Sequence, residues 1–150
     1  MSNMKLYVKK LEPCAIVPTY GSAGAAGADL YSLPAPAGED TTLLPGETKF
    51  IHTGIAAAIP EGYVGLVCAR SGLASKRGLA PANKVGVIDS DYRGEIMVAL
   101  HNHSASSQTV AAGDRIAQLL IMPVLQVELT LADELDDTAR GAGGFGSTGT

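Results

Sequence analysis

The stretch "VGVIDSDYRGEIMVALHN", Val85 to Asn102, decides the fold class. It places two extended apolar pieces on either side of a tight polar turn, Asp89 to Gly94, which is the pattern of a β-hairpin. Outward from it, short apolar runs alternate with turn residues, and the chain holds 18 glycines and 8 prolines in 150 residues. Many short strands joined by such turns indicate an all-β protein. We expect a jelly-roll-like β-barrel or sandwich.

The remaining elements are expected on both sides of this hairpin. Other strands are predicted at 5–11, 48–59 and 61–70. "SGLASKRG" predicts one short helix, with Ser71 as its cap and Gly78 as its end. Pro123 argues against a long helix in the apolar segment 115–131. We expect that segment to be a strand that packs on a neighbouring subunit.

Composition limits the class of protein. The length suits a single domain, 1–150, with a β core to about residue 135 and a flexible, glycine-rich lid over 136–150. The net charge is −4 without a basic run, which argues against binding to a nucleic acid polymer. An apolar run long enough for a membrane span is missing, and Cys14 and Cys68 have neither disulfide-framework nor metal-ligand spacing. We expect a cytoplasmic protein that binds no membrane.

Polar side chains follow several of the apolar runs. Arg70, Ser71 and Gly72 stand where a strand meets the helix, and a guanidinium, a hydroxyl and free helix N–H groups suit a phosphate. A capped helix with a surface arginine is the alternative. Asp89 at a hairpin tip could act as general base for a water, although Asp and Ser also simply suit a turn. "GDRIAQ", which contains Gln118, is by itself more typical of a turn with an ion pair.

The tail "RGAGGFGSTG", 140–149, combines glycines with one cation and one aromatic ring. Glycines let backbone N–H groups approach a polyphosphate closely. Arg140 adds charge, and Phe145 can stack on a base. A flexible linker is the alternative for glycine and serine alone.

Taken in order, five stretches resemble the five motifs of the trimeric deoxyuridine triphosphatases (dUTPases). Ala69 departs from that family, which usually has proline before Arg-Ser. The stretches are "AGADLYS" (26–32), "ARSGLA" (69–74), "GVIDSDYRG" (86–94), "GDRIAQL" (113–119) and "RGAGGFGSTG" (140–149).

The resemblance implies a homotrimer of jelly-roll-like subunits whose active sites are shared, with two chains forming the pocket and the third lending its tail as a lid. The implied reaction is hydrolysis of dUTP to dUMP and pyrophosphate, which limits uracil in DNA and supplies dUMP for dTTP synthesis. Asp89 would activate the water that attacks the α-phosphorus. Mg²⁺ would bind the triphosphate, and Asp29 would hold it through metal-bound water.

The resemblance also implies roles in substrate binding. Arg70, Ser71, Gln118, Arg140 and Ser147 would contact phosphates, Phe145 would stack on uracil, Asn83 would assist the backbone in binding it, and Tyr92 would lie under the deoxyribose. The other residues that it places against the substrate are Gly72, Gly86, Val87, Ile88, Met97 and Gly146.

Two alternatives remain at this point. A dCTP deaminase, alone or combined with dUTPase activity, shares the fold, although "GVIDSDYRG" and the glycine tail match the hydrolase. A non-catalytic nucleotide-binding regulatory protein is the alternative of another class, and Asp89, Asp29, Arg140 and Phe145 argue against it. His101 and His103 could suggest a metal pair, but no acidic or cysteine ligand is evident nearby in the sequence. We interpret them as ordinary surface histidines.

Overall fold

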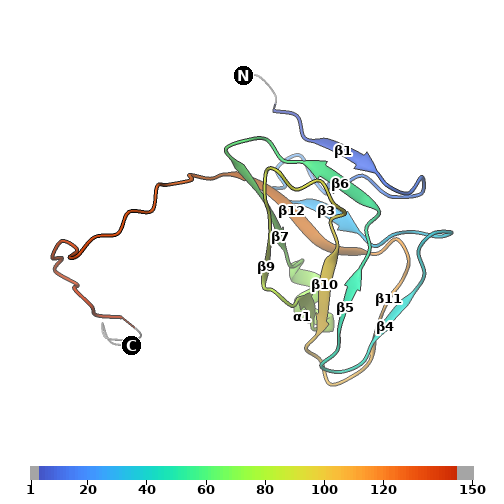
Figure 1. Ribbon diagram of the computed structural model, residues 1–150. Coiled ribbons are helices and arrows are strands. Elements are labelled where there is room, and N and C mark those ends of the chain that lie inside the picture. The colour runs from blue at the N-terminus through green and yellow to red at the C-terminus, as the bar shows by residue number, and fades with distance from the viewer. Residues whose placement is uncertain (1–3, 145–150) are drawn as a thin grey trace.

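The computed structural model describes residues 4–144, which form twelve strands and one short helix (Figure 1). No helix in this part of the chain has the length and apolar character needed to cross a membrane. The elements are β1 (Tyr7–Lys10), β2 (Thr19–Tyr20), β3 (Ala28–Tyr31), β4 (Thr41–Leu43), β5 (Thr48–Ile51), β6 (Ile55–Ala58), β7 (Tyr63–Cys68), α1 (Ser71–Arg77), β8 (Leu79–Pro81), β9 (Val85–Ile88), β10 (Val98–Asn102), β11 (Gln108–Val110) and β12 (Arg115–Pro123).

The strands form four antiparallel groups. A five-stranded sheet has the order β2-β3-β12-β7-β9, and a three-stranded sheet has the order β5-β10-β8. Two pairs, β1-β6 and β11-β4, complete the barrel. Because neighbours in these sheets are far apart in sequence, the chain crosses repeatedly between them, as in jelly rolls. This confirms the expected all-β, jelly-roll-like fold with one short helix.

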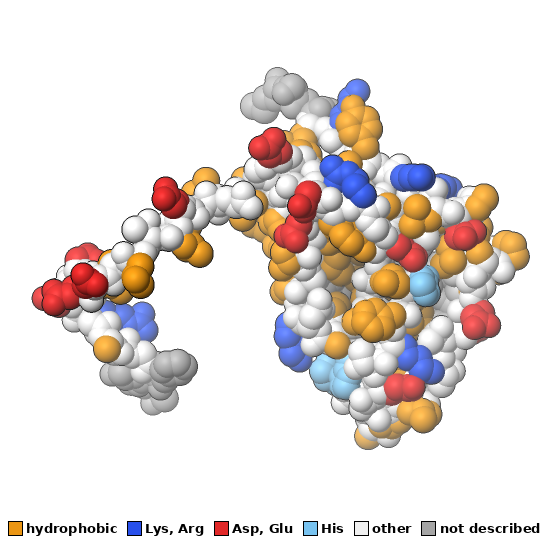
Figure 2. All heavy atoms as spheres, viewed as in Figure 1, with side chains coloured by type: hydrophobic (Ala, Val, Ile, Leu, Met, Phe, Trp, Pro, Cys, Tyr) orange, Lys and Arg blue, Asp and Glu red, His pale blue; other side chains and the backbone are white. Residues whose placement is uncertain are grey.

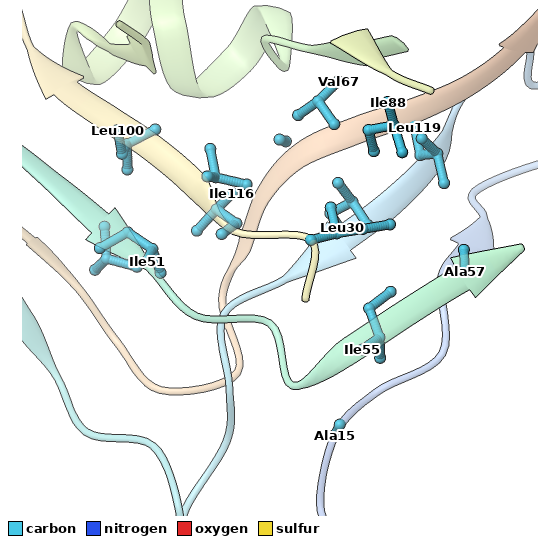
Figure 3. Packing of buried hydrophobic residues seen from close by; sticks show 14 of the residues in the cluster. Ala15, Leu30, Ile51, Ile55, Ala57, Val67, Ile88, Leu100, Ile116 and Leu119 are labelled. Carbon is cyan, nitrogen blue, oxygen red and sulfur yellow. The ribbon is translucent and has the colours of Figure 1, made fainter. Parts of the chain in front are cut away.

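The core is aliphatic, which agrees with an aromatic content of only 5% in the sequence. Leu30 of β3 and Ile116 of β12 come from the larger sheet, and Ile51 and Leu100 come from the smaller one. Figure 3 shows these side chains in one cluster between the strands. Leu30 and Leu100 are completely buried. Burial of such side chains, at about 1.5–3 kcal/mol each, holds the two sheets together.

The helix confirms one predicted boundary and corrects the other. Gly78 ends α1 with φ of 65°, a left-handed conformation that glycine adopts without strain, and its N–H donates to the Ala74 carbonyl. Ser71 does not cap the helix, because the turn after β7 starts it one residue earlier. Arg70 is the N-cap and forms no capping side-chain hydrogen bond.

Two other sequence predictions were wrong, the second of them for residues 115–123 of the segment 115–131. β9 and β10 do not pair as a hairpin, because β9 joins the five-stranded sheet and β10 the three-stranded one. We call Val85–Asn102 the split hairpin. β12 packs between β3 and β7 of its own chain and ends at Pro123. Only residues 124–144, the C-terminal arm, leave the barrel, and the expected boundary near residue 135 lies within this arm (Figure 1).

Asn102 at the end of β10 is completely buried and links three segments. Its amide nitrogen donates to the carbonyls of Leu43 and Ser106 at 3.0 and 2.8 Å, and its carbonyl oxygen accepts from the Ser104 N–H at 2.9 Å. We expect Asn102→Ala to lower the free energy of unfolding by about 3 kcal/mol, because buried polar groups lose their partners.

Urea unfolding at fixed protein concentration measures this loss. Thr42→Val is the matched control, since it removes an exposed hydrogen bond to Thr109. It should cost less than about 1 kcal/mol. Equal losses for the two variants would contradict the role assigned to burial of Asn102.

Candidate active site

The split hairpin encloses a cavity of about 240 Å³. Because β9 and β10 diverge into different sheets, a gap opens between them, and Val67 of β7 and Phe50 of β5 close its sides. The cavity brings together seven residues predicted from the sequence, namely Asn83, Gly86, Val87, Ile88, Asp89, Tyr92 and Met97.

The backbone of β9 is free on one side. β9 is the last strand of its sheet and pairs only with β7, so in the described part of the chain its other edge has no strand partner. An unpaired edge presents N–H and C=O groups in alternation. Gly86 to Asp89 line the cavity along this strand. The cavity is therefore suited to a planar ring with its own donors and acceptors.

Tyr92 takes a compact position in the turn of the split hairpin. A Cβ at Gly94 would lie 2.4 Å from the Tyr92 Oη and 2.6 Å from its Cζ, so the ring lies over this glycine. The Tyr92 hydroxyl donates to the Glu95 carbonyl oxygen at 2.9 Å. Glycine at position 94 therefore leaves room for the ring beside the cavity.

Glu95, which sequence reasoning missed, also lines the cavity. One carboxylate oxygen accepts from the N–H groups of Thr53 and Gly54 at 3.1 and 2.8 Å, and the other contacts His52 Nδ1 at 2.9 Å. Burial alone would raise the pKa of this carboxyl, but the hydrogen bonds from His52, Gly54 and Thr53 outweigh it and the pKa lies below its ordinary value. Glu95 is therefore ionised at neutral pH. In the sequence, the only sign that Glu95 would line the cavity is its position directly after the turn Asp89 to Gly94.

A second group of polar side chains lies where β7 meets α1. Asp29 of β3 accepts from Arg70 Nε at 2.7 Å and from Arg115 Nη1 at 3.3 Å. Asp29 is buried, whereas both guanidinium groups are partly exposed. Two cations around one anion leave a net positive charge, and Ser71 and Gly72 begin the helix beside it. This arrangement suits an anion with several oxygens, such as a polyphosphate.

Gln118 lies in the middle of this cluster. In β12 it pairs with Asp29 on one side and with Cys68 on the other, and its amide nitrogen donates to the Ala69 carbonyl at 2.9 Å. A Cβ at Gly27 would lie 2.6 Å from Gln118 Oε1, so glycine makes room for this side chain.

Arg115, which the sequence predicted only as part of an ordinary ion pair, reaches the cluster through an irregularity in β12. Positions 115 and 118 would lie on opposite faces of a regular strand. A register shift between Arg115 and Ala117 places Arg115 opposite Tyr31 and Gln118 opposite Asp29, so both lie on one face. Short-range sequence patterns do not reveal such a bulge.

The donors around Asp29 decide what kind of metal site is possible. Between residues 4 and 144, no group of three or more histidine, cysteine or carboxylate side chains could hold a metal ion. Both oxygens of Asp29 already accept from arginines, but a carboxylate has about four acceptor positions. The residues therefore fit a Mg²⁺ ion that keeps waters and binds mainly to phosphate oxygens, with Asp29 accepting from a metal-bound water.

Asp89 and the cationic cluster lie at opposite ends of β7, and the cavity extends between these ends as far as Val67 and Asn83. Ile88, just before Asp89, pairs with Gly65, whereas Arg70 follows Cys68 at the other end of the strand. In this register Asp89 lies level with Val64, and Arg70 follows six positions later, two of them beyond the end of β7, which is on the order of 20 Å at 3.3 Å per residue. One chain therefore does not bring its Asp89 and its Arg70 together.

Of the predicted tail residues, Arg140 is described, and it is not part of either group. Arg140 lies on the C-terminal arm, where its Nε donates to the Gly143 carbonyl at 2.7 Å. The arm stands clear of the barrel (Figures 1 and 2). Phe145, Gly146 and Ser147 lie outside the described residues.

His101 and His103 do not line the cavity, and their ring centroids are 4.3 Å apart. Slight desolvation, then the charges of His101 and Lys84, lower the pKa of His103. The nearby lysine also disfavours a cation. Their interpretation as surface histidines stays a prediction.

Comparison with known proteins gives one consistent family. The dUTPase family model matches residues 14–149. The deoxyuridine 5'-triphosphate nucleotidohydrolase of Nautilia profundicola is 51% identical over 97% of this chain and 99% of its own length. That of Desulfitobacterium hafniense is 53% identical over 99% of both chains.

Solved structures agree. A G164S mutant of the dUTPase of Staphylococcus bacteriophage 80alpha, with dUpNHpp, superposes with a TM-score of 0.88 at 32% identity, over 97% of this chain and 99% of that one. A dUTPase variant from phage phi11 of S. aureus, with a structural Mg(II) ion, has a TM-score of 0.78 at 30% identity over 87% and 98% of the two chains.

Proposed function

The chain belongs to the dUTPase family, and from this premise we propose that it hydrolyses dUTP to dUMP and pyrophosphate in an active site shared between chains. The observation that carries the assignment is the cavity of the split hairpin, where a free backbone edge ends on a carboxylate, Asp89. The same chain carries a cationic cluster suited to phosphates around Asp29.

Base selection follows from the backbone edge. Gly86 to Ile88 offer N–H and C=O groups to the edge of uracil, and Asn83 adds an amide. Cytosine presents a donor where uracil presents an acceptor, which would leave buried groups unpaired. Val87 and Met97 close the cavity around the ring. Tyr92 lies under the deoxyribose and leaves no room for a 2′-hydroxyl.

Phosphate binding and the reaction follow from the remaining charges. Arg70, Ser71, Gly72 and Gln118 bind the phosphate oxygens. Asp89 accepts a proton from the water that attacks the α-phosphorus, and pyrophosphate leaves in line with that attack. Bound Mg²⁺, held through water by Asp29, supplies charge neutralisation on the triphosphate.

The distance between Asp89 and Arg70 in one chain supports a shared site. A nucleotide whose α-phosphorus lies at Asp89 is out of reach of Arg70 of the same subunit, on the order of 20 Å away. We therefore place the Arg70 cluster of a second copy beside Asp89 of the first. In a homotrimer with threefold symmetry, each subunit places its Arg70 cluster beside Asp89 of the next subunit. The ring then contains three identical sites and no Asp89 without an Arg70 cluster beside it.

The C-terminal arm supports association of copies. Leu125, Val127, Leu129 and Leu131 are 88, 68, 91 and 96% exposed and alternate with polar residues, which is a strand pattern without a sheet. Figure 2 shows apolar side chains along the arm. The accessible surface is 10078 Å². A compact monomer of this mass has roughly 7,100 Å². The arm therefore docks on another subunit. In this way the third chain of the trimer brings its Arg140, Phe145, Gly146 and Ser147 as a lid to a pocket that the other two chains form.

The conditions for activity follow from the same proposal. The protein requires Mg²⁺ and acts in the cytoplasm on free dUTP. It binds no nucleic acid polymer and no membrane. A net charge of −4 is consistent with a small-molecule substrate recognised by a local cationic cluster.

A parallel assay of dUTP, dCTP, dTTP and UTP with Mg²⁺ tests the function. We expect pyrophosphate from dUTP and at least about a hundredfold less from the other three nucleotides. Each of these either leaves a polar group of the cavity without a hydrogen-bond partner or overlaps sterically with the residues around it. Ammonia release is measured alongside. Ammonia from dCTP would move the assignment to a deaminase, and silence on all four would favour a binding protein.

A further inference from the structure

We propose that Glu95 is a positioning residue that sets the discrimination against ribonucleotides, by fixing the part of the split hairpin that holds Tyr92. This inference rests on the proposed function, since it assigns a role within the same site. The Glu95 carboxylate anchors the segment to the turn between β5 and β6, and the Glu95 carbonyl accepts the Tyr92 hydroxyl at 2.9 Å.

The anchor is a turn whose two successive N–H groups, those of Thr53 and Gly54, both donate to the Glu95 carboxylate. Gly54 has φ of 69°, and a Cβ there would lie 2.5 Å from Leu33 Cδ1 and 3.0 Å from Ala15 Cβ, so only glycine fits. This conformation directs the N–H groups of Thr53 and Gly54 at one carboxylate oxygen, at 3.1 and 2.8 Å. The turn is packed on the core, so it is a rigid support.

The next residue is tied to the same turn. The Ile96 N–H donates to the Ile55 carbonyl at 2.9 Å, and the Thr53 hydroxyl donates to the Ile96 carbonyl at 2.5 Å. The segment between Tyr92 and β10 is therefore held to this turn at two successive residues, Glu95 and Ile96. The Ile96 N–H belongs to the same planar peptide unit as the Glu95 carbonyl, so this hydrogen bond and the Glu95 carboxylate hold that carbonyl together.

That carbonyl decides where the Tyr92 ring lies. The ring lies over Gly94 with its hydroxyl on Glu95, so a movement of the Glu95 main chain is passed directly to the ring. A sugar with a 2′-hydroxyl is excluded by contact with this ring, and a displacement of about 1 Å is enough to change such a contact substantially. Glu95 therefore acts through Tyr92 and not on the substrate.

The test compares kcat and KM for dUTP and UTP in the full chain with Mg²⁺. Glu95→Ala should reduce the ratio of kcat/KM for dUTP over UTP by between about 10- and 100-fold. KM for dUTP should rise more than kcat falls, because Asp89 is untouched. Glu95→Gln should keep a ratio within about threefold of wild type, since its carbonyl still accepts from both N–H groups.

Ser32→Ala is the matched control, because it removes another buried hydrogen bond, to the Ala111 carbonyl at 2.9 Å, away from the split hairpin. It should lower the melting temperature without changing the ratio. Glu95→Asp, which is one methylene too short to span the anchor, replaces the alanine variant if that variant does not fold, and should shift the ratio in the same direction.

The outcomes separate this inference from the proposed function. Loss of discrimination in Glu95→Ala or Glu95→Asp, with retention in Glu95→Gln and Ser32→Ala, supports the positioning role. An unchanged ratio in Glu95→Ala or Glu95→Asp, in a protein that hydrolyses dUTP, overturns it and leaves the function intact. A wild-type protein that does not hydrolyse dUTP overturns the proposed function and, with it, this role.

Discussion

Asp89→Asn is expected to lower kcat for dUTP hydrolysis by about 10²- to 10⁴-fold, the usual contribution of a general base. Asparagine has nearly the same shape and still lines the cavity, but it cannot accept the proton of the attacking water. The dissociation constant for dUTP should change by less than about fivefold, because the backbone edge of β9 and the cationic cluster are intact. Steady-state kinetics and calorimetric titration measure the two quantities.

Asp91→Asn is the matched control, because Asp91 lies in the same turn and does not line the cavity. It should keep kcat within about threefold of wild type, since no proton transfer is assigned to it. An Asp89→Asn protein with near wild-type kcat would remove Asp89 from the role of general base.

Mixing two inactive variants is expected to restore activity. In trimers that contain Asp89→Asn and Arg70→Ala chains, a shared site is intact when its Asp89 comes from an Arg70→Ala chain and its Arg70 comes from an Asp89→Asn chain. Around a ring of three subunits that contains both chain types, this holds for one of the three sites. About a third of the wild-type activity should therefore return in mixed trimers, provided that copies associate by closed symmetry.

The two chains are co-expressed with different affinity tags, and mixed assemblies are isolated through both tags. Each variant expressed alone is the control, and each should stay at least about a hundredfold below wild type. Mixed assemblies that are as inactive as either variant alone would show that Asp89 and Arg70 of one chain serve the same nucleotide.

Local patterns in the sequence predicted much of the fold but not its strand pairing. The alternation around Tyr63 to Cys68 and the Ser71–Gly78 helix signal depend on neighbouring residues, and the structure has both elements. The pairing of β9 with β7, in place of β10, depends on contacts between residues distant in sequence. Short strands such as β8 and β11 were missed because three residues show no periodicity.

The residues of the candidate site likewise include some whose proximity follows from the local sequence and others that are brought together only by the fold. Asn83, Gly86 and Tyr92 lie in one short stretch, so their grouping follows from the chain itself. The contact of Arg115 with Asp29 depends on a bulge, and the anchor of Glu95 depends on a turn more than forty positions earlier. Neither leaves a short-range pattern. The proposed association of Asp89 with Arg70 involves two copies of the chain, so it does not follow from the geometry of one chain alone.

A crystal structure of the protein with Mg²⁺ and dUpNHpp tests the shared site most directly. The imido group between the α- and β-phosphorus slows cleavage, so that the bound state can be observed. We predict one nucleotide contacted by Asp89 of one subunit and by Arg70 and Gln118 of another. A nucleotide whose uracil, α-phosphate and terminal phosphate are all bound by the same chain would contradict the account.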